Sequence, residues 1–176
     1  MTVAGVTIRR LGANDVEAYR ALRLQAIRAT PFAFTASFEE ESTKPLSTMI
    51  DRLIAPGRPD DAVFGAFDDA GKLIGIAGLA VAQRPQERHS ATLFGMAVAP
   101  HATRRGVGRA LVVRTLEHAG SVHGLLQVQL RVSEGNAAAE HLYRSCGFEE
   151  WGREPRAIMV QGTAVTKIHM VRMLDA

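Results

Sequence analysis

The chain has 176 residues, a formal net charge of +3, and 47% hydrophobic, 22% charged and 6% aromatic residues. This length and composition predict one domain, spanning residues 1–176, that is large enough to bury a core. The small positive charge suits an anionic ligand, but so little net charge and so few aromatic side chains argue against a nucleic-acid partner.

The N-terminal part of the chain predicts one strand and two helices. The first twenty residues reach charged side chains before any apolar core as long as that of a signal peptide. Residues 6–11 predict the strand, and Asn14 or Asp15 is suited to cap the first helix. The second helix is expected over residues 45–53. One face of the first helix is apolar and comprises Ala18, Leu22, Ala26 and Ala29.

The middle of the chain predicts a hairpin and a further strand. Two apolar runs are joined by Asp68–Asp69–Ala70–Gly71, whose turn chemistry favours a hairpin. The longest apolar run, residues 73–82, is about half as long as a membrane span, so we expect a buried strand. Residues 91–98 predict another strand. These features predict a cytoplasmic protein that has no membrane partner.

The chain after residue 120 predicts a strand, a helix and a closing hairpin. Residues 125–132 predict the strand, and residues 136–146 predict a helix that ends with Gly147 in a left-handed cap. Cys146 is the only cysteine, which excludes an intramolecular disulfide, and we expect it to be a structural thiol.

The last two strands are expected over residues 149–160 and 164–174, with a turn at Gln161–Gly162. Together with the elements before them, they predict an α+β fold in which helices pack around a mostly antiparallel sheet.

The stretch TRRGVGRALV, residues 103–112, has the composition of an anion-binding loop. Gly106 and Gly108 have no β-carbon and leave room for a phosphate, and a helix that begins at Gly106 or Val107 offers unpaired amides. Arg104 and Arg105 add positive charge. The same pattern also fits a tight strand-to-helix turn with solvated arginines, and this stretch alone does not decide between the two.

Two other nucleotide-binding loops fit this stretch less well. A Walker loop requires Lys followed by Ser or Thr after its last glycine, where this chain has Arg109 and Ala110. A dinucleotide-binding fingerprint requires a third small residue where Leu111 stands, and an acidic residue near position 128, which is Val128.

The chain has two motifs, one that ends at Gly108, near the start of the helix after the loop, and one that begins at Asn136. Val98 and Pro100 end a strand before Gly106 and Gly108, and the later stretch NAAAEHLYRSCGF contains Asn136, Ala139, Leu142, Tyr143, Gly147 and Phe148. In these motifs the chain resembles the GNAT superfamily of acetyl-CoA-dependent N-acetyltransferases. One position departs from the family pattern, because Thr103 stands where Gln or Arg is usual.

The resemblance implies a central sheet of about seven strands flanked by about four helices. It implies an acyltransferase that moves the acetyl group of acetyl-CoA to a primary amine of a small molecule or protein, without a metal. The backbone of Met96, Ala97 and Val98 would pair with the pantetheine arm, and an N–H of Met96 or Val98 would face the thioester oxygen. The pyrophosphate would lie on a loop comprising Thr103, Arg104, Arg105, Gly106, Val107, Gly108 and Arg109.

The resemblance also assigns roles to two residues of the later helix. Tyr143 would protonate the leaving thiolate, because a phenol keeps its proton at neutral pH. Asn136 would hydrogen-bond the cofactor arm, although it is equally suited to be only the helix N-cap.

The general base stays open, with six side chains or a water chain as alternatives: Glu39, Glu40, Glu41, Glu134, Glu154 and His169. The segment of residues 32–42 shapes the acceptor site in the family. Its Phe32, Phe34 and Phe38 are either a wall of that site or core residues. Arg153 and Arg156 either meet an acidic acceptor or lie on an exposed hairpin edge.

Three classes of function remain open besides the identity of the acceptor and a possible homodimer. The first is the N-acetyltransferase. The second is a non-catalytic acyl-CoA-binding sensor, against which Tyr143 argues. The third is a polyanion-binding module, for which the net charge is small.

Overall fold

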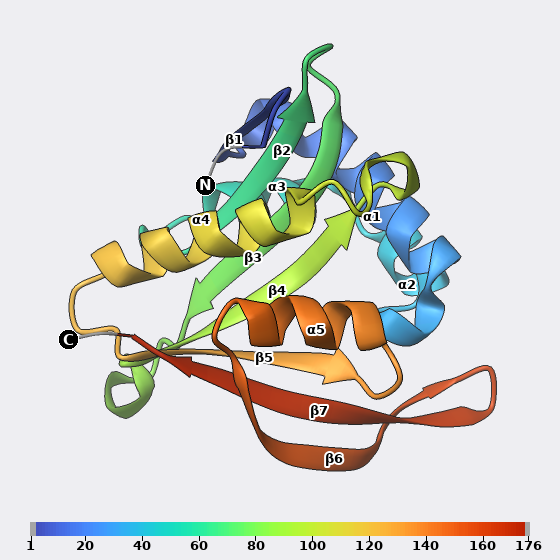
Figure 1. Ribbon diagram of the computed structural model, residues 1–176. Helices are drawn as coiled ribbons and strands as arrows, with labels where there is room; N and C mark the ends of the chain where they lie inside the picture. Colours follow the sequence, from blue (N-terminus) through green and yellow to red (C-terminus); the bar gives the residue numbers. More distant parts are fainter. Residues whose placement is uncertain (1–2, 175–176) are drawn as a thin grey trace.

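The computed structural model describes residues 3–174 and contains a seven-stranded sheet in the order β1-β2-β3-β4-β5-β7-β6 (Figure 1). Every neighbouring pair of strands is antiparallel except β4 and β5, which are parallel. The prediction of an α+β fold with a mostly antiparallel sheet is confirmed. The strands are β1 (Val6–Arg10), β2 (Ala62–Asp68), β3 (Leu73–Val81), β4 (Ser90–Val98), β5 (Gln127–Ser133), β6 (Glu149–Val160) and β7 (Thr163–Met173).

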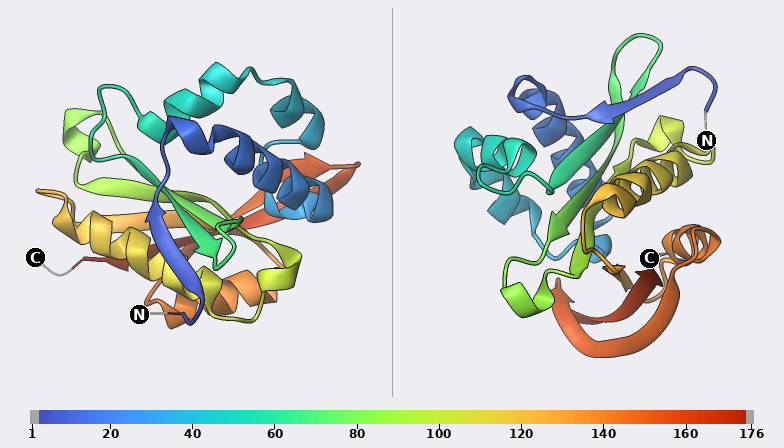
Figure 2. Two further views of the ribbon diagram at one scale, coloured as in Figure 1. Left: turned by 90° about the horizontal axis from the view of Figure 1, so that it is seen from above. Right: turned by 90° about the vertical axis from the view of Figure 1, so that its left-hand side faces the viewer.

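Helices cover both faces of the sheet (Figure 2). One face carries the first three helices, and the other carries α4 and α5. The helices are α1 (Val16–Ala29), α2 (Phe38–Thr43), α3 (Leu46–Ile54), α4 (Val107–Ser121) and α5 (Ala137–Ser145). Short 3-10 turns include η2 (Pro31–Ala33) and η4 (Pro100–Ala102). Among residues 3–174, no helix has both the length and the apolar character needed to cross a membrane.

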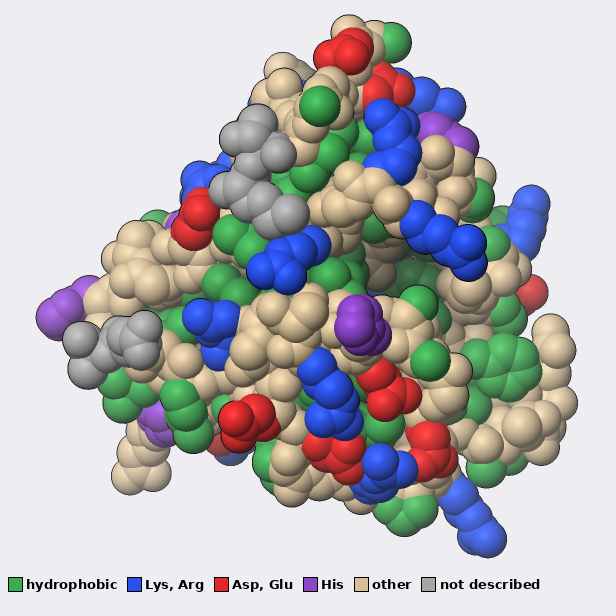
Figure 3. Space-filling model, viewed as in Figure 1, with side chains coloured by type: hydrophobic (Ala, Val, Ile, Leu, Met, Phe, Trp, Pro, Cys, Tyr) green, Lys and Arg blue, Asp and Glu red, His purple; other side chains and the backbone are tan. Residues whose placement is uncertain are grey.

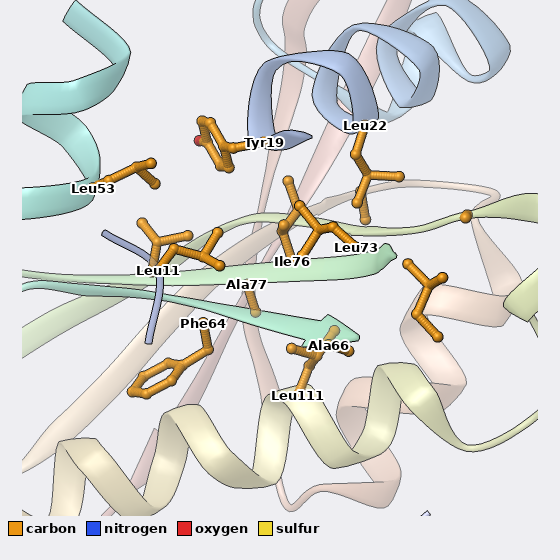
Figure 4. Close-up of a cluster of buried hydrophobic side chains, with 14 of the residues drawn as sticks. Leu11, Tyr19, Leu22, Leu53, Phe64, Ala66, Leu73, Ile76, Ala77 and Leu111 are labelled. Carbon is orange, nitrogen blue, oxygen red and sulfur yellow. The ribbon is translucent and has the colours of Figure 1, made fainter. Parts of the chain in front are cut away.

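The core lies between the sheet and both helical layers. Leu73 and Ile76 of β3 point toward α1, whereas Phe64 and Ala66 of β2 point toward α4, from which Leu111 points back at the sheet (Figure 4). All five side chains are at most 6% exposed. Both faces of β2 and β3 are therefore buried, which explains why their sequences are apolar without alternation.

The hairpin turns were predicted by their residue types. Gln161 and Gly162 have φ angles of 49° and 79°, so both central residues of the β6–β7 turn are left-handed, as a two-residue type I′ turn requires. In the β2–β3 turn, the Asp68 carboxylate accepts from the amides of Ala70 and Lys72 at 3.0 and 2.9 Å.

Asp15 is the N-cap residue of α1, as predicted, but the predicted capping hydrogen bond is not formed. Neither Asn14 nor Asp15 caps the helix through its side chain; both lie in a preceding 3-10 turn. The Asp15 carboxylate accepts from the Gly12 amide at 2.8 Å and pairs with Arg9 at 2.7 Å.

The buried face of α1 is also rotated from the predicted one. Ala18 and Ala29 are exposed. The buried side chains are Val16, Tyr19, Leu22, Arg23 and Ile27. The alanines contribute little apolar area, so the larger Tyr19 and Ile27 decide which face packs on the sheet.

Candidate functional site

The parallel strands β4 and β5 pair only at one end. Ser90, Ala91 and Thr92 register with Gln127, Val128 and Gln129, and beyond these three pairs the strands diverge (Figure 1). The second half of β4 therefore has a free backbone edge in the middle of the sheet. Such an edge can pair with an extended ligand in the manner of an added strand.

The free edge of β4 includes the predicted Met96–Val98 segment. The Ala99 amide donates to the Ile74 carbonyl on the β3 side at 2.8 Å. Because successive N–H groups of a strand point to opposite sides, the Val98 N–H points toward the gap that β5 leaves.

A β-bulge interrupts β4 just before this segment. Ile76 and Gly78 of β3 register with Ala97 and Phe94, so β4 has one extra residue between the two pairs. Gly95 lies in this bulge with a φ of 64°. A bulge bends the strand and redirects its backbone groups, which is how sheets commonly adapt next to binding sites.

The predicted anion loop connects β4 to α4. Gly106 is left-handed, with a φ of 81°, and is the N-cap of α4, so the first amides of the helix are unpaired at the surface. The Thr103 hydroxyl donates to the Pro100 carbonyl at 2.9 Å. Thr103 thus closes the η4 turn and does not replace the long side chain that is usual at its position.

Gly108 permits α4 to approach β4 and α5 closely. A β-carbon at position 108 would lie 3.1 Å from Met96 Cε and 3.3 Å from Leu142 Cδ2. Gly106 therefore suits the backbone conformation of this turn, and Gly108 suits the close packing of α4.

A cavity of about 750 Å³ extends from this loop along β4 to α1 and α5. On the surface it opens as a hollow between the start of α4 and α5, with Lys or Arg side chains at its edge (Figure 3). Of the predicted site residues, Arg105 and Val107 do not line the cavity; Arg105 is exposed and Val107 is buried in the core. The others line it: Met96, Ala97, Val98, Thr103, Arg104, Gly106, Gly108, Arg109, Asn136 and Tyr143.

Tyr143 projects from α5 to the inner wall of the cavity. Its side chain is 6% exposed and packs edge-on against Phe148, with ring centroids 5.9 Å apart. Within residues 3–174 the Tyr143 hydroxyl makes no hydrogen bond, so it is free to donate to a group in the cavity. Burial, and to a lesser extent the neighbouring Cys146, raise the pKa of Tyr143 above its usual value.

Asn136 is the N-cap of α5. Its side-chain oxygen accepts from the Ala139 amide at 3.3 Å, and Asn136 also lines the cavity. The capping role is present, and the amide nitrogen of the side chain is left to donate toward a ligand.

None of the predicted base candidates lines the cavity. Glu41 is fully buried, where its carboxylate pairs with Arg23, with Lys44 at 2.8 Å and with Arg52 at 3.0 Å. These cations lower the pKa of Glu41 to about 2 against the opposing effect of burial, so it is a structural anion.

The remaining candidates lie at the protein surface. Glu39 and Glu40 are exposed on α2. Glu134 pairs with Arg153, and His169 Nε2 lies 2.9 Å from the Glu154 carboxylate. Among the described residues that line the cavity there is no Asp or Glu. No group of three or more His, Cys, Asp or Glu side chains within residues 3–174 is placed to hold a metal ion.

Several lining residues were not predicted from the sequence. They come from α1, the segment around η2, β5 and α5, and include Leu22, Gln25, Ala26, Ala29, Thr30, Ala33, Arg131, Ala138 and His141. Of Phe32, Phe34 and Phe38, only Phe34 lines the cavity. Phe38 instead lies under the Arg28 guanidinium, which is 4.0 Å from its ring centroid. For Ala26 and Ala29, the row of small residues on one face of α1 was the available sequence signal.

Comparison with known proteins identifies related sequences. The model of the acetyltransferase (GNAT) family matches residues 23–148. Mycothiol acetyltransferase from Salinispora tropica is 31% identical over 149 residues, which cover 84% of this chain and 46% of that protein. The chain thus spans less than half the length of this relative.

Solved structures with the same fold cover nearly the whole chain. Ribosomal-protein-alanine N-acetyltransferase from Brucella melitensis has a TM-score of 0.83 and 27% identity, covering 96% of this chain and 99% of that one. A putative acetyltransferase from Salmonella typhimurium, solved with its cofactor acetyl-CoA, has a TM-score of 0.84 and 21% identity, covering 97% and 95%. At 21% identity, the similarity to the Salmonella typhimurium protein shows only that the two chains share a fold.

Proposed function

Because the chain belongs to the acetyltransferase (GNAT) family, we propose that it transfers the acetyl group of acetyl-CoA to a primary amine of a small molecule or protein. The observation that most supports this proposal is the free edge of β4, which leads from the loop at Gly106 to the hydroxyl of Tyr143 within one cavity.

The loop before α4 would hold the pyrophosphate. The unpaired amides at Gly106, Val107 and Gly108 and the positive end of the α4 dipole favour an anion there. Arg104 and Arg109, which line the same end of the cavity, would add charge-assisted hydrogen bonds.

The extended arm of the co-substrate would lie along β4. Val98 and its neighbours offer backbone groups to it, and the side-chain amide of Asn136 offers a further donor from α5. When bound, acetyl-CoA supplies an activated acyl group as a thioester. The Val98 N–H, or that of Met96, would then hydrogen-bond the carbonyl oxygen as negative charge develops on it.

In the transfer, the amine nitrogen forms a bond to the acyl carbon, and the bond from that carbon to sulfur breaks. The sulfur leaves as a thiolate and takes the proton of the Tyr143 hydroxyl, and the phenolate that remains regains a proton from solvent before the next turnover. No carboxylate among the described residues lines the cavity, but His141 of α5 does, so its imidazole or a water is the proposed acceptor of the proton that the amine loses.

Two measurements on one preparation test this function. Calorimetric titration should detect acetyl-CoA binding, and release of free CoA thiol should depend on both the enzyme and an amine from a mixed panel. Binding without amine-dependent thiol release would support the non-catalytic sensor instead. Absence of binding would contradict both functions.

A further inference from the structure

The charges on the cavity wall are all of one sign. Its charged lining residues are Arg104, Arg109 and Arg131, and within the described chain no acidic side chain joins them. Arg104 and Arg109 belong to the proposed phosphate-binding loop and the first turn of α4. Arg131 belongs to β5, so the proposed cofactor role does not account for it.

Arg131 lies on the face of the sheet that η2 covers. Residues 131 and 133 are two apart on β5 and therefore point to the same face. The Ser133 hydroxyl hydrogen-bonds the Phe32 carbonyl of η2, which identifies that face. Val132, between them, packs in the buried cluster that contains Tyr143. Arg131 and Tyr143 thus approach the cavity from opposite faces of the sheet, through the gap between β4 and β5.

A second cation lies behind Arg131. Lys167 of β7 is 2% exposed, and its ammonium donates to Ser133 Oγ at 2.8 Å and to the Ala33 carbonyl at 3.4 Å. Within residues 3–174 it forms no ion pair with a carboxylate. Burial, and then the positive charge of Arg131, lower the pKa of Lys167, and the negative charge of Glu154 only partly opposes this shift.

The nearest carboxylate does not neutralise both cations. Glu154 lies 3.4 Å from Arg131, and the same oxygen lies 2.9 Å from His169. The Arg131 and Glu154 side chains are 48% and 44% exposed, so an ion pair of this kind is weak in water. A net positive charge therefore remains at this end of the cavity.

The rest of this end is mostly apolar. Leu22, Ala26 and Ala29 come from α1, and Ala33 and Phe34 follow from the η2 segment. A polyamine brings several positive charges and would be repelled here. A protein N-terminus brings a neutral amide next to its amine and gives Arg131 no anionic partner besides Glu154.

We propose that the acceptor is an amine that also has a carboxylate, as an apolar L-amino acid does, and that Arg131 binds this carboxylate. The inference rests on the proposed acetyl transfer and names the substrate class of the same site. Arg131 is the specificity-determining residue, the apolar wall receives the side chain, and the amine is directed toward β4.

The test compares each amino acid with its own amide. L-leucine, L-valine and L-phenylalanine, their carboxamides, and spermidine are the acceptors, and kcat/KM is measured by CoA thiol release. The variants are Arg131→Met, Arg131→Lys and, as a control, Arg153→Met. Arg153 is an exposed arginine on β6 that lies outside the cavity lining and pairs with Glu134 and Glu150.

We expect Arg131→Met to reduce the acid-to-amide ratio of kcat/KM about tenfold or more, mainly through KM of the acid. Arg131→Lys should retain part of the ratio, and Arg153→Met all of it. Affinity for acetyl-CoA should be the same in all four proteins. The amino group of an amino acid is more basic than that of its carboxamide, and this difference affects kcat/KM. Because it affects wild type and variant equally, it cancels when their acid-to-amide ratios are compared.

Two results would overturn the inference and leave the acetyl transfer standing. One is turnover of spermidine or of the amides with none of the acids. The other is an acid-to-amide ratio that Arg131→Met leaves unchanged. If no amine is acetylated although acetyl-CoA binds, the proposed function fails, and the inference fails with it.

Discussion

Gly108 of α4 lies directly against Met96 of β4, since a β-carbon at position 108 would stand 3.1 Å from Met96 Cε. This contact joins the helix whose N-terminus forms the loop to the strand whose free edge forms the cavity wall. The loop and the strand are thereby held at a fixed separation. Any enlargement of residue 108 should therefore alter both.

Gly108→Val should lower the thermal midpoint and weaken acetyl-CoA binding together. Valine adds three carbons where even the first would press on Met96 and Leu142 in a closely packed region. Gly120→Ala on the same helix is the matched control, because a β-carbon there meets nothing within 4 Å. The control should stabilise the helix by roughly 0.5–1 kcal/mol. Equal thermal midpoints for Gly108→Val and wild type would contradict the packing role.

Gly106→Glu should abolish acetyl-CoA binding while the fold is retained. A β-carbon at this position would have its nearest contact at 3.6 Å, to Val3, so there is room for it, and the carboxylate would occupy the proposed pyrophosphate position. Gly106→Ala separates the effect of charge from that of backbone strain, since both variants place a side chain at a φ of 81°. Titration calorimetry should show a much larger loss for Glu than for Ala. A folded Gly106→Glu protein with unchanged affinity would exclude the loop from cofactor binding.

Arg104 and Arg105 form a natural pair for comparison. Arg104 lines the cavity and Arg105 does not, although the two are adjacent and both exposed. Arg104→Ala should weaken CoA binding by about 1–3 kcal/mol, the scale of a charge-assisted hydrogen bond, and Arg105→Ala should have little effect. If the 3′-phosphate is the partner, dephospho-CoA should remove the difference. Equal losses at both positions would indicate only a general electrostatic attraction.

Glu41 is expected to govern acid stability. Its pKa is about 2 in the folded protein, below the ordinary value of 4.5. The folded state therefore binds this proton more weakly than the unfolded state does. The resulting stabilisation is complete above about pH 4.5 and is lost as the pH falls toward 2.

Glu41→Gln should lower the free energy of unfolding at pH 7 by about 3–5 kcal/mol, because it leaves the buried Arg23 and its neighbours without their counter-charge. It should also flatten the dependence of stability on pH between about 2 and 4.5. Denaturant unfolding at several pH values measures both effects. Glu39→Gln, on the exposed face of α2, is the control, and a similar loss there would refute the special role of Glu41.

Helix ends and turns could be predicted from the sequence, because a few neighbouring residues determine them. Asn136 and Gly147 bracket α5 as predicted, and Gly147 has a φ of 84°. Turn residues identified both hairpins because their conformational preferences are local. The start of α4 at Gly106 was predictable for the same reason, since a left-handed residue before a helix is a local feature that favours glycine.

Features that depend on distant partners were not predictable. Arg23 is buried on α1 because Glu41, eighteen residues later, accepts its hydrogen bond, and no helical periodicity reveals such a pairing. Arg131 reaches the cavity because β4 and β5 diverge, which is a property of the whole sheet. The acidic run of residues 39–41 suggested a general base. Only the fold reveals that Glu41 is fully buried and paired with Arg23.

Tyr143→Phe is the most direct test of the proposed chemistry, because it removes one hydroxyl and keeps the ring that packs against Phe148. If that hydroxyl protonates the thiolate, turnover should fall about a hundredfold or more, the usual scale for a positioned acid. Acetyl-CoA affinity should hardly change, because the proton transfer matters in the transition state. Since burial raises the pKa of Tyr143, wild-type turnover should show no alkaline loss from this group below about pH 10. Turnover and thermal midpoint, measured on one preparation, separate this role from packing. An unchanged rate with a small loss of stability would assign the proton to water and leave Tyr143 as a core residue.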